Sequence, residues 1–167
     1  RGEIVVTQEF SDNVHFGIDI YPSDESAWDV YAVADGTVVK IERNIDYRTT
    51  NPNSAASIKA GNFVKIKHNL SVWNPYQAYT KSEIYTIVMH LKEVDPNLQL
   101  NQTVIGGETR LGRIGNTGYT LSDTGGDGTH LHFELREDGS DISNSTRRNP
   151  REYIFFGDGN PELIPDC

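Results

Sequence analysis

The chain has 167 residues and a formal net charge of −9, from 15 basic and 24 acidic side chains. This length allows a substantial core without disulfides or oligomerisation, so we expect a monomer with one domain over residues 1–167. The acidic excess argues against a nucleic-acid-binding protein, and no apolar run approaches the roughly 18 residues of a membrane-spanning helix.

Short β-type runs alternate with turn signals along the whole sequence and predict a mostly antiparallel β protein. In chain order, the clearest runs are 4–7, 30–33, 37–41, 62–68, 84–90 and 130–136. Asp35-Gly36 separates two of them and favours a hairpin at that point. No stretch of about 11 residues keeps a helical period without glycine or proline, so any helix should be short and peripheral.

Three longer stretches interrupt these runs, at residues 46–60, 71–81 and 119–129. The last is rich in glycine, aspartate, serine and threonine. Loops of this length in a compact domain are usually functional rims or mobile insertions.

The ends of the sequence carry little information about its environment. The one cysteine, Cys167, is the last residue and leaves the redox compartment undetermined. The sequence begins at Arg1 without an apolar signal region, so we interpret it as a mature or excised domain whose targeting segment is not included.

The first candidate metal pair is His15 and Asp19, four positions apart. The residues around them oppose a helix. On a fully extended strand their Cα atoms would lie about 13 Å apart, too far to share an ion. We therefore predict a bend or bulge near Gly17. The alternative is a polar His15 on a half-buried strand and an Asp19 that begins a turn.

The second candidate is the His130-Leu131-His132 segment. On a strand both imidazoles point to one face, with Cα atoms about 7 Å apart, while Leu131 and Phe133 point into the opposite layer. One or both imidazoles can serve a zinc ion, which in catalytic sites takes three protein ligands and keeps one position for water. The alternative is two solvated histidines on an exposed face.

Other polar residues have simpler interpretations. His90 shares a strand face with Val88, which is typical of a capping or hydrogen-bonding residue, and His68 is interpreted as structural. Glu134 can accept a hydrogen bond from a ligand imidazole, although a surface carboxylate is the simpler expectation. The acidic residues of the 119–129 loop are expected to be solvated.

Motifs of several other enzyme classes are absent from the sequence. It contains no His-Glu-x-x-His, no Gly-x-Ser-x-Gly and no phosphate-binding Gly-x-x-x-x-Gly-Lys. The chemistry that fits the remaining residues is metal-activated water with histidine as the proton carrier, because an imidazole pKa near 6.5 suits neutral pH.

The motifs also form an ordered series along the chain. The series comprises His15-Phe16-Gly17-Ile18-Asp19, the segments 30–38, 61–68, 86–91 and 111–118, His130-Leu131-His132-Phe133-Glu134, and the segment 149–153. In this order the segments resemble the lysostaphin/LytM-type zinc metallopeptidases, which cut peptide bonds in bacterial peptidoglycan. The resemblance covers about residues 13–154.

The resemblance implies an antiparallel β-sandwich, of the barrel-sandwich hybrid or duplicated hybrid motif type, with a groove walled by loops. It implies that His15, Asp19 and His132 bind one zinc ion per chain, and that His90 and His130 are the catalytic pair. The spacing of the histidines alone does not decide which member of the His-x-His segment is the ligand.

By the same resemblance we expect a zinc-dependent endopeptidase that acts on peptidoglycan stem peptides or cross-bridges, in an extracellular, periplasmic or cell-envelope location. Asn62, Tyr119 and Thr129 are the candidate groove residues. The chain departs from the family at Val88, where a tyrosine is usual, and at Thr129, where a proline is usual, and its 119–129 loop is longer. Substrate preference therefore does not transfer.

Two other functions fit parts of this pattern. One is a non-hydrolytic wall-binding or activator domain of the same fold, but such domains usually lose metal ligands, and all family positions are filled here. The other is a phosphocarrier domain of related fold, in which two close histidines exchange a phosphoryl group, but it would need neither His15 nor Asp19.

Overall fold

The computed structural model describes residues 4–11, 14–23, 28–69, 83–122, 126–139 and 147–152. The predicted loop at 71–81 lies outside the described residues, as do Tyr153 and Cys167.

The described residues fold mainly into strands. In chain order these are β1 (Ile4–Gln8), β2 (Ile18–Pro22), β3 (Asp29–Tyr31), β4 (Gly36–Glu42), β5 (Arg48–Thr49), β6 (Asn62–Asn69), β7 (Glu83–Leu91), β8 (Glu93–Val94), β9 (Thr103–Val104), β10 (Arg110–Arg113), β11 (Gly118–Tyr119), β12 (Leu131–Arg136) and β13 (Arg147–Arg148). Helical structure among the described residues is limited to α1 (Ala56–Ala60) and the 3₁₀ turn η2 (Pro150–Glu152). The predicted mostly antiparallel β fold with short helix is confirmed, and every predicted run overlaps a strand. No described helix has both the length and the apolar character to cross a bilayer.

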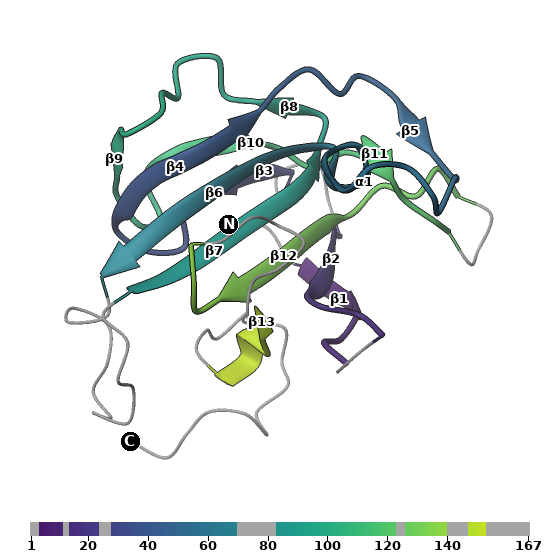
Figure 1. Cartoon of the computed structure of the whole chain (residues 1–167), viewed down its shortest axis with the longest axis horizontal. Coiled ribbons are helices and arrows are strands. Elements are labelled where there is room, and N and C mark those ends of the chain that lie inside the picture. The colour runs from purple at the N-terminus through teal and green to yellow at the C-terminus, as the bar shows by residue number, and fades with distance from the viewer. Residues whose placement is uncertain are drawn as a thin grey trace.

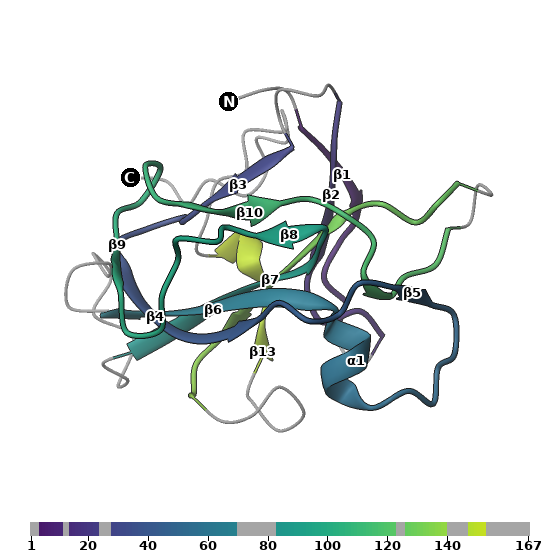
Figure 2. The same cartoon turned by 90° about the horizontal axis from the view of Figure 1, so that it is seen from above.

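All described strands except the pair β5 and β11 form two layers. The large sheet has the order β1-β2-β12-β7-β6-β4-β9, with β13 also paired to β12 (Figure 1). A smaller sheet, β3-β10-β8, lies across one face of it, while α1 and β13 lie on the other side (Figure 2). The strand order of the large sheet ends at β1 and β9, so within the described residues it does not close into a barrel.

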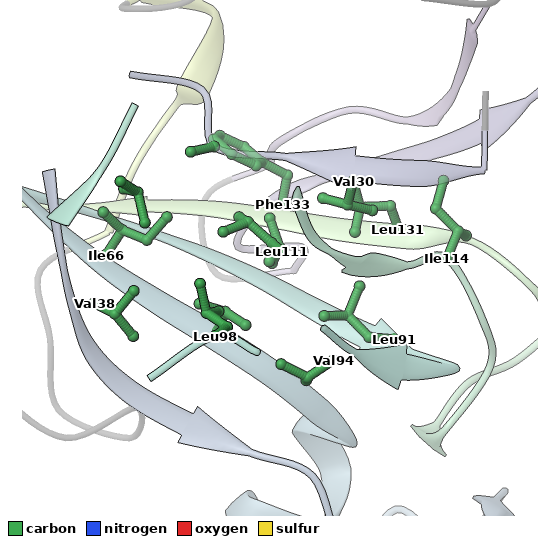
Figure 3. Packing of buried hydrophobic residues seen from close by; sticks show 14 of the residues in the cluster. Val30, Val38, Ile66, Leu91, Val94, Leu98, Leu111, Ile114, Leu131 and Phe133 are labelled. Carbon is green, nitrogen blue, oxygen red and sulfur yellow. The ribbon is translucent and has the colours of Figure 1, made fainter. Parts of the chain in front are cut away.

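The hydrophobic core fills the space between the two sheets. Leu131 and Phe133 of β12 and Ile66 of β6 meet Val30 and Leu111 of the smaller sheet there (Figure 3). Burying one such side chain stabilises the fold by about 1.5–3 kcal/mol. Because side chains alternate along a strand, the residues between them on β12 must face the other side of the large sheet.

The predicted hairpin at Asp35-Gly36 is wrong. β3 pairs with β10 in the smaller sheet, whereas β4 pairs with β6 and β9 in the large one, so the turn joins the two layers. Its anchors are long-range: His68 Nδ1 donates to the Asp35 carbonyl (2.8 Å), and the Gly106 amide donates to Asp35 Oδ1 (2.9 Å). His68 is thus the structural residue that the sequence predicted.

The long stretch at 46–60 contains β5 and α1 rather than only loop. β5 pairs in parallel with β11, and both lie beside α1 (Figure 1). Ala60 of α1 packs on a second, smaller apolar cluster with Phe63, Ile87 and Met89. This cluster places α1 against the face of the large sheet that is turned away from the main core.

Candidate active site

Asp19 and His132 lie side by side because β2 and β12 pair in antiparallel register. The register sets His132 opposite Asp19 and Phe133 opposite Ile18. Phe133 and Ile18 are buried in the core, so their neighbours point to the opposite face. There, Asp19 Oδ1 lies 2.7 Å from His132 Nδ1.

His15 reaches the same place because the chain bends at Gly17, as the sequence predicted. His15 Nε2 lies 3.1 Å from Asp19 Oδ1 and 3.2 Å from His132 Nδ1. Only glycine fits at the bend, because a Cβ at position 17 would lie 2.5 Å from the Phe133 carbonyl oxygen and 2.7 Å from His132 Nε2.

The outer nitrogens of both imidazoles are hydrogen-bonded to oxygens that can only accept. His15 Nδ1 lies 2.9 Å from the Glu9 carbonyl oxygen, and His132 Nε2 lies 3.2 Å from Glu134 Oε1. These outer nitrogens therefore carry the protons, so the inner nitrogens of the neutral rings present lone pairs. When both rings are neutral, two lone pairs and the Asp19 carboxylate face one another, an arrangement that suits a shared metal ion; when His132 is protonated, its Nδ1 donates to Asp19 Oδ1 instead.

The donor set fits a zinc ion. His15, Asp19 and His132 form a group of side chains able to hold a metal. Two imidazole nitrogens and one carboxylate oxygen are typical zinc ligands, and tetrahedral bonds of about 2.0–2.1 Å would set neighbouring donors about 3.3 Å apart. The measured separations of 2.7 to 3.2 Å approach that value. Three such protein ligands would leave one zinc position for water or substrate.

The pKa values of the cluster agree with a site that stabilises positive charge. Burial would raise the pKa of the Asp19 carboxyl, but hydrogen bonds with His132 and His15 outweigh it and hold that pKa well below its ordinary value. Burial would lower the pKa of His132, but the carboxylates of Asp19 and Glu134 outweigh burial and raise it to about 9.

His90 joins the site through an irregularity in β7. Between the pairs Asn62–Leu91 and Val64–Val88, β7 has one more residue than β6, and His90 adopts a positive φ of 62°. Strict alternation would turn His90 to the core side with Val88, so the predicted face is wrong. This bulge instead brings the His90 ring to within 4.9 Å of the His130 ring, centroid to centroid.

His90 and His130 are held alike. His90 Nδ1 donates to the Thr117 carbonyl (2.9 Å) and His130 Nδ1 donates to the Gly128 carbonyl (2.8 Å), which leaves Nε2 of each ring as the basic nitrogen. Burial, followed by the neighbouring imidazoles, lowers the pKa of His90 to about 3. Burial also lowers the pKa of His130. Both rings are therefore neutral near pH 7, with a lone pair on Nε2.

Glu134 is not the surface carboxylate that was the simpler expectation. It is 5% exposed. Its Oε2 accepts hydrogen bonds from Nε (2.6 Å) and Nη2 of Arg136, a residue with no exposed surface. Arg147 Nε lies 3.5 Å from the same oxygen. Sequence reasoning missed both arginines. The alternation of His132, Glu134 and Arg136 could have indicated Arg136, but no local signal marks Arg147.

A cavity of about 540 Å³ opens over these residues. The five predicted catalytic and metal-binding residues all line it, and Tyr119 is on its wall. Thr129 lines a neighbouring cavity of about 420 Å³ that also touches Asp19 and His130.

Asn62 does not line either cavity, so the structure gives it a different place from the predicted groove. It is 3% exposed, its Nδ2 donates to the Leu91 carbonyl (3.2 Å), and its Oδ1 accepts from the Ile45 amide (3.0 Å). Asn62 therefore braces the backbone beside the β7 bulge.

Comparison with known proteins agrees with this geometry. The family model for "Peptidase family M23" matches residues 13–144. The catalytic domain of the prophage-encoded M23 protein EnpA from Enterococcus faecalis superposes with a TM-score of 0.55 and 19% identity, covering 90% of this chain and 91% of that one. The catalytic domain of the antimicrobial peptidase lysostaphin from Staphylococcus simulans gives 0.51 and 19%, covering 89% and 84%.

A zinc-containing peptidase from Vibrio cholerae also has this fold, with a TM-score of 0.51 and 22% identity over 78% of this chain and 32% of that one. No curated protein matches the sequence. At these identities the structural likenesses establish the fold.

Proposed function

Because the chain belongs to peptidase family M23, we propose that it is a zinc-dependent endopeptidase that hydrolyses peptide bonds in bacterial peptidoglycan. The observation that carries this proposal is the convergence of His15, Asp19 and His132 within 3.2 Å of one another, beside two further imidazoles in one cavity. Two proteins of similar structure, an antimicrobial peptidase and a zinc-containing peptidase, support it.

A zinc ion held by these donors would polarise the peptide carbonyl and lower the pKa of a water molecule. The other two histidines would supply proton transfer. In His90 and in His130, Nδ1–H donates to a backbone carbonyl oxygen, so Nε2 is the nitrogen without a proton. Nε2 of a neutral ring can accept a proton from water. The resulting imidazolium can donate a hydrogen bond to the oxyanion and then transfer that proton to the leaving nitrogen as the C–N bond breaks.

On this proposal the protein acts outside the cytoplasm, at the cell envelope or beyond, with a peptidoglycan peptide as its partner, and the length of the chain leads us to expect a monomer. The cavity wall includes residues of the long stretch 46–60 and of the 119–129 loop, which is longer than is usual in the family. The choice between a direct cross-link and a bridge therefore depends on side chains particular to this chain.

Metal analysis and wall digestion of two variants test the proposal. His132→Ala removes an inner nitrogen of the cluster, so the purified variant should contain no zinc. His130→Ala leaves all three donors, so it should retain one zinc per chain while turnover falls by about 10²- to 10⁴-fold, the usual contribution of an acid–base imidazole.

The substrate for both assays is intact walls of differing cross-link chemistry, with the released peptides identified by mass. Chelation should abolish wild-type activity and added zinc should restore it. An unchanged zinc content in His132→Ala would refute the ligand assignment. Full turnover by His130→Ala would refute its catalytic role. Bound zinc without any turnover by the wild type would indicate a wall-binding domain instead.

A further inference from the structure

The solvent-facing charge of the main cavity is positive, although the chain as a whole carries −9. Four side chains of fixed charge line the cavity: Asp19, Glu134, Lys59 and Arg147. The two carboxylates are buried, and both contact His132. Lys59 and Arg147 are the partly exposed ones. A substrate entering the cavity therefore meets cations at its accessible surface.

Arg147 is held at a junction on the edge of β12. β2 pairs with the first half of this edge, up to Phe133, and β13 takes over at the pair Leu135–Arg148, which the pair Arg136–Arg147 follows. Phe16, just before β2, lies at this change of partner, and the Arg147 guanidinium carbon is 4.3 Å from the centre of its ring. Stacking on an aromatic face and strand pairing fix the position of the guanidinium.

The contact of Arg147 with Glu134 leaves part of the Arg147 side chain exposed. Glu134 already receives two hydrogen bonds from Arg136, so two guanidinium groups flank one carboxylate. The neighbouring Arg147 lowers the pKa of Arg136, after the larger effect of burial. The Nε atom of Arg147 is buried. Since the side chain is still 21% exposed, its exposed part lies elsewhere on the group.

We propose that Arg147 forms an anion subsite of the cavity and that the substrate carries a carboxylate close to the bond that is cut. This inference rests on the proposed function and narrows its substrate class. Guanidinium groups bind carboxylates through paired, charge-assisted hydrogen bonds. A bridge made only of glycines has no side-chain carboxylate, so the subsite favours a stem peptide with acidic groups.

Lys59 lies towards the other end of the cavity. Its Nζ is 6.0 Å from the centre of the Tyr119 ring, and Tyr119 belongs to β11. A β-bridge joins Gly115, which precedes β11, to His130, which directly precedes β12. Arg147 instead pairs with Arg136, the last residue of β12. Lys59→Gln is therefore a comparison variant that removes a cavity cation without touching the proposed subsite.

Matched peptides test the proposal directly. Cross-linked stem peptides of the chemistries present in the wall digests are synthesised in two pairs, whether or not the wild type cleaves them. One pair differs at the C-terminus, carboxylate against carboxamide, and the other differs at an acidic residue beside the cleaved bond, acid against amide. In one of the pairs, wild-type kcat/KM should favour the carboxylate by about 10- to 100-fold, the usual contribution of a charge-assisted contact. The pair that responds identifies the source of the carboxylate.

Arg147→Gln should abolish this preference while cleavage of the amide peptide and the zinc content stay unchanged, and Arg147→Lys should keep part of it. The matched control is Arg148→Gln, because Arg148 Nη2 bonds to Glu137 Oε2 (2.6 Å) and the residue does not line the cavity. Arg148→Gln should retain the full preference.

Three results would overturn the subsite: no wild-type preference in either pair, an equal loss on acid and amide peptides in Arg147→Gln, or loss of the preference in Lys59→Gln alone. An equal loss with reduced zinc would mean that Arg147 only supports Glu134 and His132.

Binding measurements separate this inference from the proposed function. Zinc-loaded His130→Ala should bind the carboxylate peptide about 10- to 100-fold more tightly than its amide, as measured by titration calorimetry. If that preference is present while the wild type cleaves no peptide, the proposed function fails and the subsite stands. If the wild type cleaves both peptides equally and the variant binds both equally, the subsite fails and the function stands.

Discussion

Replacing Glu134 with glutamine tests whether the carboxylate behind His132 supports both the fold and the metal site. Glu134 and Arg136 are buried together, with Arg136 Nε 2.6 Å from Glu134 Oε2. Glutamine keeps the size of the side chain and one acceptor oxygen. It removes the charge that faces Arg136 and Arg147, and the acceptor strength offered to the His132 N–H falls.

The expected loss of stability follows from the burial of the pair. Removing one partner of a buried ion pair costs about 3–5 kcal/mol, because the other charge is left uncompensated. Asp138 also favours the charge of Arg136, which places the expected cost near the lower end. For a chain of this size, about 3 kcal/mol corresponds to a fall of about 6–12 °C in Tm. Zinc affinity should fall by about 10- to 100-fold, the usual effect of removing the partner of a ligand imidazole.

Denaturant unfolding of the zinc-free protein measures the first quantity, and competition with a chelator measures the second. Glu137→Gln is the matched control, since Glu137 pairs with an Arg148 side chain that is 39% exposed and does not contact the metal cluster. It should cost less stability and leave zinc affinity unchanged. The reasoning is refuted if Glu134→Gln and Glu137→Gln match the wild type equally closely in both measurements.

Two further changes probe the close approach at Gly17 and the buried His68. Gly17→Ala should lower Tm and weaken zinc binding at least about tenfold, because the added Cβ would displace the His132 ring. The control Gly126→Ala should do neither, since the nearest atom to a Cβ there is 3.4 Å away. Equal zinc affinities of the two variants would contradict this reasoning. Burial lowers the pKa of His68, so the unfolded chain binds more protons below about pH 6.5 and the free energy of unfolding should fall as the pH falls there, by at most about 1.4 kcal/mol per pH unit from this group. Urea unfolding between pH 5 and 7 should show a smaller slope for His68→Gln than for the wild type, and identical slopes would show that His68 is not the group responsible.

The sequence predicts the strands well because alternation is a local property. Leu131 and Phe133 do face the core, and His132 and Glu134 do share the other face. Asp35-Gly36 shows where local signals stop: the dipeptide specifies a turn, but the partners of the strands on either side are set by contacts far along the chain. The turn is therefore predictable and the hairpin is not.

The metal cluster was predictable only in part for the same reason. The bend at Gly17 follows from the spacing of His15 and Asp19, because an extended strand would keep them too far apart. The approach of Asp19 to His132 depends on the register of β2 against β12, between residues 113 positions apart in the sequence. Neither the spacing of these residues nor the composition of the chain predicts which residues of β2 and β12 pair. The grouping of Asp19 with His132 was predicted only through the resemblance of the ordered motifs to a known family.

His90 is the residue for which periodicity gives the opposite answer from the structure, and the bulge explains why. A non-glycine residue at positive φ costs about 1–2 kcal/mol, so the extra residue in β7 is not a relaxed continuation of the strand. Without it, the His90 ring would turn to the core side, next to Val88, and His130 would lack a second imidazole. The hydrogen bond from Nδ1 to the Thr117 carbonyl and the bracing of Leu91 by Asn62 offset this cost. These hydrogen bonds thus hold the second imidazole in place on a strained backbone. Alternation along the sequence alone cannot predict where such a bulge lies.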